Sequence, residues 1–195
     1  MHKIAFSGIH GSGKTAILAE VKKILSLKSR IEDVPSLRLS SRFDFDQKID
    51  FISQFFFISN QINEENIRSL PQPDFLLCDC SVLDHWIQCQ NFLAEKKTRG
   101  QAEEKNRLLK NLYHFWIPTY TVHFRIRIDG KVLEKRLPKN EWPVPETDPS
   151  HSLDALYGQI IQADQIHAID IWNHKSVDES AQEVLKKIGE LKLLY

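Results

Sequence analysis

The stretch Gly8-Ile9-His10-Gly11-Ser12-Gly13-Lys14-Thr15, which reads GIHGSGKT, decides how the rest of the chain is interpreted. It fits the pattern G-x-x-x-x-G-K-[ST] at every fixed position, follows an apolar run at Lys3–Ser7 and opens a helical pattern at Lys14–Leu27. Glycines let the backbone curl so that successive N–H groups point at one anion. A helix that begins near Gly13 directs the positive end of its dipole at the same place. The motif therefore predicts a phosphate-binding loop.

The loop residues have separate expected roles. We expect Lys14 to contact the β- and γ-phosphates of a nucleoside triphosphate, and the Thr15 hydroxyl to ligate Mg²⁺. The other residues expected to contact the nucleotide are Gly8, His10, Gly11, Ser12, Gly13 and Ala16. The side chain of His10 is expected to point outward, past the phosphates. ATP is favoured over GTP, because the stretch 173–176 (NHKS) does not match the guanine-reading sequence N-K-x-D.

Charge and composition exclude several kinds of partner. The 195 residues include 26 Lys plus Arg and 26 Asp plus Glu, so the formal net charge is zero. Such a chain has no overall field to hold a polyanion, and we expect no nucleic-acid partner. No apolar run approaches the roughly 20 residues that cross a bilayer, so no membrane partner is expected either. Three cysteines and a start without a signal-peptide layout favour the cytoplasm. The oligomeric state is not indicated.

Short apolar runs alternate with longer amphipathic segments, which predicts an α/β fold. We expect a three-layer P-loop NTPase fold, with a parallel sheet of about five strands and helices on both faces. The expected strands are Lys3–Ser7, Arg30–Val34, Phe75–Asp79, Val122–Ile128 and Ala168–Trp172. The expected helices are Lys14–Leu27, Asp46–Asn66, Ser81–Leu93, Glu103–Trp116, Gly130–Leu137, Ser152–Ala163 and Asp178–Leu191. Residues 1–195 are interpreted as one domain, and the Pro-rich segment at about 137–150 as a lid-like flap.

Acidic residues lie at two predicted strand ends. Asp79 ends an apolar run, and the carboxyl ends of parallel strands face the ligand crevice, so Asp79 is the predicted second ligand of Mg²⁺. The alternative is that Asp79 caps the helix starting near Ser81. Asp84 is interpreted as a solvated helix residue, with a substrate contact as the less favoured alternative. Glu32 or Asp33 is either a base toward an acceptor hydroxyl or part of a charged turn.

Two further patterns have competing explanations. Cys78, Cys80, His85 and Cys89 offer ligand types that suit zinc, but a strand spreads such side chains, and buried core cysteines are favoured. The strand at Val122–Ile128 alternates His123, Arg125 and Arg127 with apolar residues. We interpret it as a half-exposed strand with one polar face; the alternative is that Arg127 holds phosphate.

The sequence resembles the P-loop nucleoside and nucleotide kinases, and looks most similar to the small AAA-type ATPase/kinase domains that include nicotinamide riboside kinase-like proteins. The stretches that carry the resemblance are GIHGSGKT at 8–15, FLLCDCSVLD at 75–84, FRIRIDGKVLEKRL at 124–137 and AIDIWNHKSVDESAQEVLKKI at 168–188. The second is similar to the family's strand that ends in Asp-Arg-Ser, and the third to the strand and short helix that lead to the lid.

The resemblance implies binding of ATP and Mg²⁺ and transfer of a phosphoryl group to a small acceptor such as a nucleoside or nucleotide. It implies catalytic roles for Lys14, for Asp79 as the acid of Asp-Arg-Ser, and for Arg136 at the start of the lid. It also places the acceptor pocket near an aromatic cluster, although core packing is the more common use of such rings. The cluster consists of Phe43, Phe45, Phe51, Phe55, Phe56 and Phe57, with Gln54 and Gln61 on the same segment.

The sequence departs from the family where Cys80 replaces the arginine and where the lid has Lys139 but no arginine. Lysine does not reproduce the planar, two-pronged contact that arginine makes with phosphate oxygens. An alternative function is therefore a nucleotide-dependent switch or slow ATPase that needs no small acceptor.

Overall fold

The computed structural model describes residues 1–37, 51–95, 101–136, 149–174 and 176–194. Five parallel strands form one sheet in the order β2-β3-β1-β4-β5. They are β1 (His2–Ser7), β2 (Ile31–Val34), β3 (Phe75–Asp79), β4 (Val122–Arg127) and β5 (Ala168–Trp172). The expected five-stranded parallel sheet is confirmed, and β3 and β5 have the predicted bounds.

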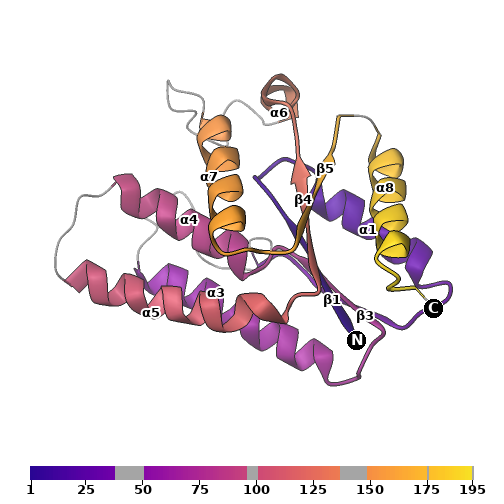
Figure 1. The fold of residues 1–195 in the computed structure, drawn as a ribbon, viewed down its shortest axis with the longest axis horizontal. Helices are drawn as coiled ribbons and strands as arrows, with labels where there is room; N and C mark the ends of the chain where they lie inside the picture. Colours follow the sequence, from indigo (N-terminus) through magenta and orange to yellow (C-terminus); the bar gives the residue numbers. More distant parts are fainter. Residues whose placement is uncertain (38–50, 96–100, 137–148, 175, 195) are drawn as a thin grey trace.

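Helices cover both faces of the sheet (Figure 1). One layer consists of α1 (Lys14–Leu25) and α8 (Val177–Glu190). The other contains α3 (Phe51–Ser69), α4 (Val82–Glu95), α5 (Gln101–Trp116) and α7 (Pro149–Ala163). The short helix α6 (Gly130–Arg136) and a 3₁₀ turn, η1 (Ile117–Thr119), flank β4 along the chain. The three-layer α/β architecture is therefore confirmed. Within the described ranges, no helix is both long enough and apolar enough to cross a bilayer.

The segment expected to form a lid is only partly described. Residues 137–148 lie outside the described residues, as do Phe43 and Phe45 of the aromatic cluster and the first residues of the helix expected from Asp46. Pro149 and Ser150 belong to α7, so this helix begins before the expected Ser152.

The order of the strands places the ligand crevice. Strands β2 and β3 lie on one side of β1 in the sheet, and strands β4 and β5 lie on the other side. Ligands of such sheets bind beyond the carboxyl ends of the strands, where the order switches direction. In this register Phe6 lies opposite Asp79, and Ser7 lies opposite Arg125. The polar residues at the ends of β1, β3 and β4 therefore meet directly below the loop that follows β1.

Successive strand residues point to opposite faces, and this divides the core in two. Ile4, Phe6 and Phe124 pack against α1 and α8, whereas Ala5 and Leu76 pack against α3, α4 and α5. Each face is covered by helices, so both faces of the central strands are buried, as parallel sheets require.

The polar face of β4 turns toward α7 and is not half-exposed as the sequence suggested. His123 is 1% exposed and Arg125 is 7% exposed. Arg125 donates from Nη2 to Oδ1 of Asp154 on α7 at 2.6 Å. Arg127 donates from Nη2 to Oδ2 of Asp154 at 2.5 Å and from Nη1 to Oδ2 of Asp170 at 3.0 Å. These carboxylates compensate the charges of both arginines. The expectation of solvent on this face was wrong for His123 and Arg125, whereas Arg127 at the end of the strand is partly exposed.

A buried ion pair ties the second helical layer to β1. Glu65 of α3 is fully buried, and its Oε2 lies 3.0 Å from Nζ of Lys3. The same carboxylate accepts hydrogen bonds from Gln61 Nε2 at 2.8 Å, Trp116 Nε1 at 2.7 Å and Tyr120 Oη at 2.5 Å. The network joins β1, α3 and α5, and leaves neither buried charge without a partner.

We expect Glu65→Ala to lower the free energy of unfolding by about 3–5 kcal/mol, because it leaves the Lys3 ammonium buried without its counter-charge. Urea denaturation followed by circular dichroism measures the change. Glu190→Ala is the matched control, since it removes the exposed ion pair with Lys187, and its midpoint should stay that of the wild type. A wild-type midpoint for Glu65→Ala would show that this pair does not hold the layer.

Candidate active site

The loop after β1 can be built only with glycine at two positions. Gly8 has φ 139° and Gly13 has φ 94°, values that side chains with a Cβ rarely adopt. A Cβ at Gly8 would collide with the carbonyl oxygen of Ile126, and one at Gly13 with the Asn173 side chain. Helix α1 then begins at Lys14. The loop therefore closes tightly over the ends of β1 and β4 and presents the start of a helix, the arrangement that binds phosphate.

Lys14 lies folded across this loop. Its Nζ donates to the carbonyl oxygens of Gly8 at 2.7 Å and Ile9 at 2.9 Å. His10 is exposed. The ammonium is thus held at the mouth of the loop, within reach of an anion that binds there.

The loop is also held by a residue that the sequence analysis did not assign to the site. Asn173 directly follows β5, is fully buried, and donates from Nδ2 to the Ser12 carbonyl oxygen at 2.6 Å. Ser180 of α8 contacts Asn173 Oδ1 at 3.4 Å. A polar residue after an apolar parallel strand was the signal that could have identified Asn173, since that edge of the sheet carries the ligands.

Thr15 and Asp79 come together as the metal prediction requires. Thr15 Oγ1 donates to Asp79 Oδ2 at 2.6 Å. Asp79 is 3% exposed, and its Oδ1 is buried with no hydrogen-bond partner among the described residues. Burial raises the pKa of the Asp79 carboxyl above its ordinary value, against the opposing effects of the Thr15 hydrogen bond and the Lys14 charge. A hydroxyl beside a carboxylate oxygen without a donor fits Mg²⁺, which takes a few protein oxygens and keeps several waters.

Asp84 is not the solvated helix residue that the sequence suggested. It is 2% exposed, and its Oδ2 accepts the Ser81 N–H at 2.8 Å and the Ser7 hydroxyl at 2.9 Å. Its Oδ1 accepts the Gly8 N–H at 2.9 Å. Asp84 therefore receives the N–H at the start of α4, which was the alternative role considered for Asp79. The spacing S-x-x-D from Ser81 was the available signal for this helix start.

Tyr157 of α7 completes the surroundings of Asp84. Its Oη lies 2.7 Å from Asp84 Oδ1 and 3.2 Å from the Gly8 carbonyl oxygen, and the side chain is 3% exposed. No sequence pattern pointed to Tyr157, because the contact joins residues 149 positions apart in the chain.

Arg136, the residue matched to the start of the lid, lies beside the loop. Its Nη1 is 3.4 Å from the position that a Cβ at Gly13 would occupy. The end of α6 thus brings a guanidinium next to the start of α1. The structure gathers Gly8, Lys14, Thr15 and Asp79 together with Arg136 at one edge of the sheet.

Cys80 cannot replace the arginine that the resemblance implies at its position. It adopts φ 87°, and its N–H donates to the Phe6 carbonyl oxygen at 3.2 Å. Burial raises the pKa of the Cys80 thiol to about 12, so the thiol is neutral at physiological pH. The side chain supplies no charge to a phosphate. Cys78 and Cys89 are buried core residues.

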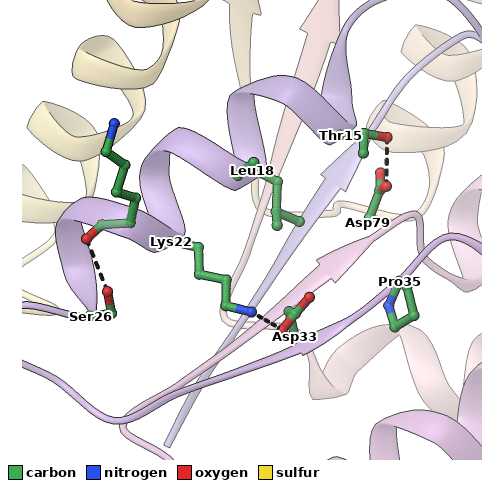
Figure 2. Close-up of a pocket in the computed structure, with 9 residues that line it drawn as sticks. Thr15, Leu18, Lys22, Ser26, Asp33, Pro35 and Asp79 are labelled. Carbon is green, nitrogen blue, oxygen red and sulfur yellow. Dashed lines mark hydrogen bonds and ion pairs between the residues drawn. The ribbon is translucent and has the colours of Figure 1, made fainter.

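The acids of β2 each have a basic partner. Asp33 pairs with Lys22 of α1, whereas Glu32 Oε2 lies 3.7 Å from Arg68 Nη1 of α3. Asp33 borders a groove of about 420 Å³ between α1 and the ends of β2 and β3 (Figure 2). The groove reaches the Thr15–Asp79 pair at one end. It is lined by Thr15, Leu18, Ala19, Lys22, Lys23, Ser26, Asp33, Pro35 and Asp79.

The aromatic cluster is divided between core and surface. Phe57 is buried, and its ring stacks on His85 of α4 with centroids 5.6 Å apart. Phe55 and Phe56 are more than a third exposed. Gln61 is occupied by Glu65 and by the Cys80 carbonyl oxygen, to which it donates at 3.3 Å. The core interpretation is therefore confirmed for Phe57 and wrong for Phe55 and Phe56.

Comparison with known proteins finds similarity in three dimensions only. No protein-family model and no curated protein sequence matches the chain. A deoxyadenosine kinase from M. mycoides with bound dCTP aligns with TM-score 0.70 and 16% identity, covering 96% of this chain and 99% of that one. A thymidylate kinase from Candida albicans gives TM-score 0.67 and 16% identity, covering 98% and 92%. For a thymidylate kinase from Ehrlichia chaffeensis the values are 0.61 and 19%, covering 96% and 98%.

These alignments include nearly the whole of each chain, so the likeness is not confined to the loop after β1. The strand order, the loop after β1 and the two helical layers agree with it. The protein therefore has the fold of the P-loop nucleoside and nucleotide kinases.

Proposed function

We propose that the protein is an ATP- and Mg²⁺-dependent kinase that transfers the γ-phosphate to a small acceptor of the nucleoside or nucleotide type. The observation that carries the proposal is the 2.6 Å contact between Thr15 and Asp79 beside Lys14, at the carboxyl edge of the sheet. This edge is where parallel α/β sheets bind ligands. The fold shared with a deoxyadenosine kinase and thymidylate kinases supports the same activity.

Each residue of the site has a definite task in this reaction. The backbone N–H groups of the loop hold the phosphates, and Lys14 turns from its loop carbonyls to the β- and γ-phosphate oxygens. Arg136 lies close enough to the loop to stabilise negative charge on the transferring group. Thr15 and Asp79 would hold Mg²⁺, which would supply positive charge to the phosphates when bound. The chain thus contributes mainly positioning and charge.

The acceptor is proposed to bind near the first turns of α3. Gln61 reaches the turn after β3, so Gln54, seven residues earlier on the same helix, lies about 10 Å further along it at the ligand edge. Gln54 is 2% exposed, and its Oε1 is buried with no hydrogen-bond partner among the described residues. Buried oxygens without a hydrogen bond are rare in folded proteins. An N–H or O–H group of the bound nucleoside or nucleotide would donate to Gln54 Oε1.

A nucleotide-dependent switch or slow ATPase is the second candidate. The neutral Cys80 thiol favours it, because one charge that would help bind a phosphate or acceptor is missing there.

The kinase proposal further includes a single domain over residues 1–195, a lid at about 137–150, no nucleic-acid partner and action in the cytoplasm.

ATP turnover with Mg²⁺ separates the two candidates. We expect one member of a panel of nucleosides, nucleoside monophosphates and nicotinamide riboside to stimulate ATP consumption at least about tenfold. Coupled detection of ADP, with the phosphorylated product identified by mass spectrometry, measures this. Slow hydrolysis at the same rate with every acceptor would favour the switch and overturn the kinase proposal.

We expect Lys14→Ala to reduce turnover at least about 100-fold and to abolish measurable ATP binding, because it removes a charged donor from the phosphates. Isothermal titration calorimetry with ATP and Mg²⁺ provides the binding measurement. Lys186→Ala is the matched control, since Lys186 is an exposed lysine of α8 whose ion pair is with Glu190 of the same helix. An affinity unchanged in Lys14→Ala would mean that the loop does not bind nucleotide.

Asp79→Asn is expected to keep the fold and weak ATP binding, and to lose at least about 99% of Mg²⁺-dependent turnover. The amide still accepts the Thr15 hydrogen bond but lacks the charge that holds a divalent ion. Turnover titrated with MgCl₂ is the measurement, and Asp178→Asn, at an exposed position of α8, is the control. Wild-type Mg²⁺ dependence in Asp79→Asn would assign the metal to other residues.

A further inference from the structure

The carbonyl oxygen of Gly8 is contacted by two donors from distant parts of the chain. Lys14 Nζ lies 2.7 Å away and Tyr157 Oη lies 3.2 Å away. Gly8 is buried, so this carbonyl cannot rely on bulk water for a hydrogen bond. Whether this carbonyl oxygen accepts a hydrogen bond therefore depends on Lys14 and Tyr157.

The Tyr157 hydroxyl has a choice of acceptors. It lies 2.7 Å from Asp84 Oδ1 and can donate its single proton to only one oxygen at a time. Asp84 does not depend on this proton. Its Oδ1 keeps the Gly8 N–H, and its Oδ2 keeps the donors from Ser7 and Ser81. The tyrosine proton can thus move from Asp84 to the Gly8 carbonyl without leaving the carboxylate unsatisfied.

Triphosphate binding creates the need for this exchange. Lys14 donates to the carbonyl oxygens of Gly8 and Ile9, and the proposed function requires its ammonium to turn to the phosphates. A buried carbonyl oxygen that loses its hydrogen-bond donor raises the free energy of the complex, and this cost opposes nucleotide binding. We propose that Tyr157 is a positioning residue: its hydroxyl donates to the Gly8 carbonyl oxygen in place of Lys14, so that the Lys14 ammonium can bind the triphosphate. This inference rests on the proposed function.

The position of Tyr157 suits this task because α7 is fixed one turn earlier. Asp154 binds Arg125 at 2.6 Å and Arg127 at 2.5 Å, both from β4. Residues three apart lie on the same side of a helix, so Asp154 and Tyr157 attach the same face of α7 to the sheet. The tyrosine hydroxyl is therefore held beside the loop, and little freedom is lost when the proton changes acceptor.

The test is Tyr157→Phe, which keeps the ring and removes only the hydroxyl. We expect the Kd for ATP with Mg²⁺, measured by isothermal titration calorimetry, to rise about tenfold. The KM for ATP should rise similarly, while kcat stays within about twofold and the KM for the acceptor is unchanged. This split follows because Lys14 is released in the ground-state complex and in the transition state alike.

Tyr113→Phe is the matched control. Tyr113 is also buried and also bonds a carboxylate near α7, with Oη 2.8 Å from Asp164 Oδ2. Among the described residues its hydroxyl contacts Asp164 and not the loop residues Gly8 or Lys14. We expect its affinity for ATP to remain that of the wild type, whatever the fall in Tm. The comparison separates loss of a buried hydroxyl in general from loss of the donor to Gly8.

Two outcomes would overturn the inference: unchanged ATP affinity in Tyr157→Phe, or an equal loss in Tyr113→Phe. Calorimetry of ATP needs no acceptor, so this result is independent of whether phosphoryl transfer occurs. Tenfold weaker ATP binding in Tyr157→Phe, without acceptor-stimulated turnover in the wild type, would retain the positioning role and reject the kinase.

Discussion

The buried carboxylate of Asp84 is the constraint on which the site depends. It is 2% exposed and accepts hydrogen bonds from Ser7, Gly8, Ser81 and Tyr157. A charge buried in this way is tolerated only when donors surround it, so the donors of Ser7, Gly8 and Ser81 must keep their places, whereas the Tyr157 proton can change its acceptor. The result is that the end of β1, the start of α4 and the middle of α7 are fixed to one point, directly below the phosphate-binding loop.

The rest of the polar interior follows from the same need to compensate buried charge. Two carboxylates, Asp154 of α7 and Asp170 of β5, neutralise Arg125 and Arg127 of β4. Glu65 of α3 neutralises Lys3 and accepts hydrogen bonds from two aromatic side chains, Trp116 and Tyr120. Carboxylates thus compensate Lys3 and the two arginines, whereas Lys14 in the loop hydrogen-bonds the carbonyl oxygens of Gly8 and Ile9.

The departures from expectation have one cause. Apolar periodicity reports which face of an element is buried, but it treats a charged residue as exposed. His123, Arg125 and Asp84 were therefore interpreted as partly or wholly solvated, although all three are buried. Their partners come from elements far away in the chain, and no local pattern indicates such pairing. Phe55 and Phe56 show the converse error, since an apolar residue next to the core is not always part of it.

The sequence by itself determined the parallel α/β fold, the phosphate-binding loop at residues 8–15 and the acid at the end of β3, because glycine spacing and apolar runs are local signals. Only the tertiary structure decided that Thr15 meets Asp79, that Asn173 supports Ser12 and that Tyr157 reaches Gly8. These contacts span 64, 161 and 149 positions of the chain. The order of the strands creates them, and that order is set by the packing of whole layers and not by any one segment.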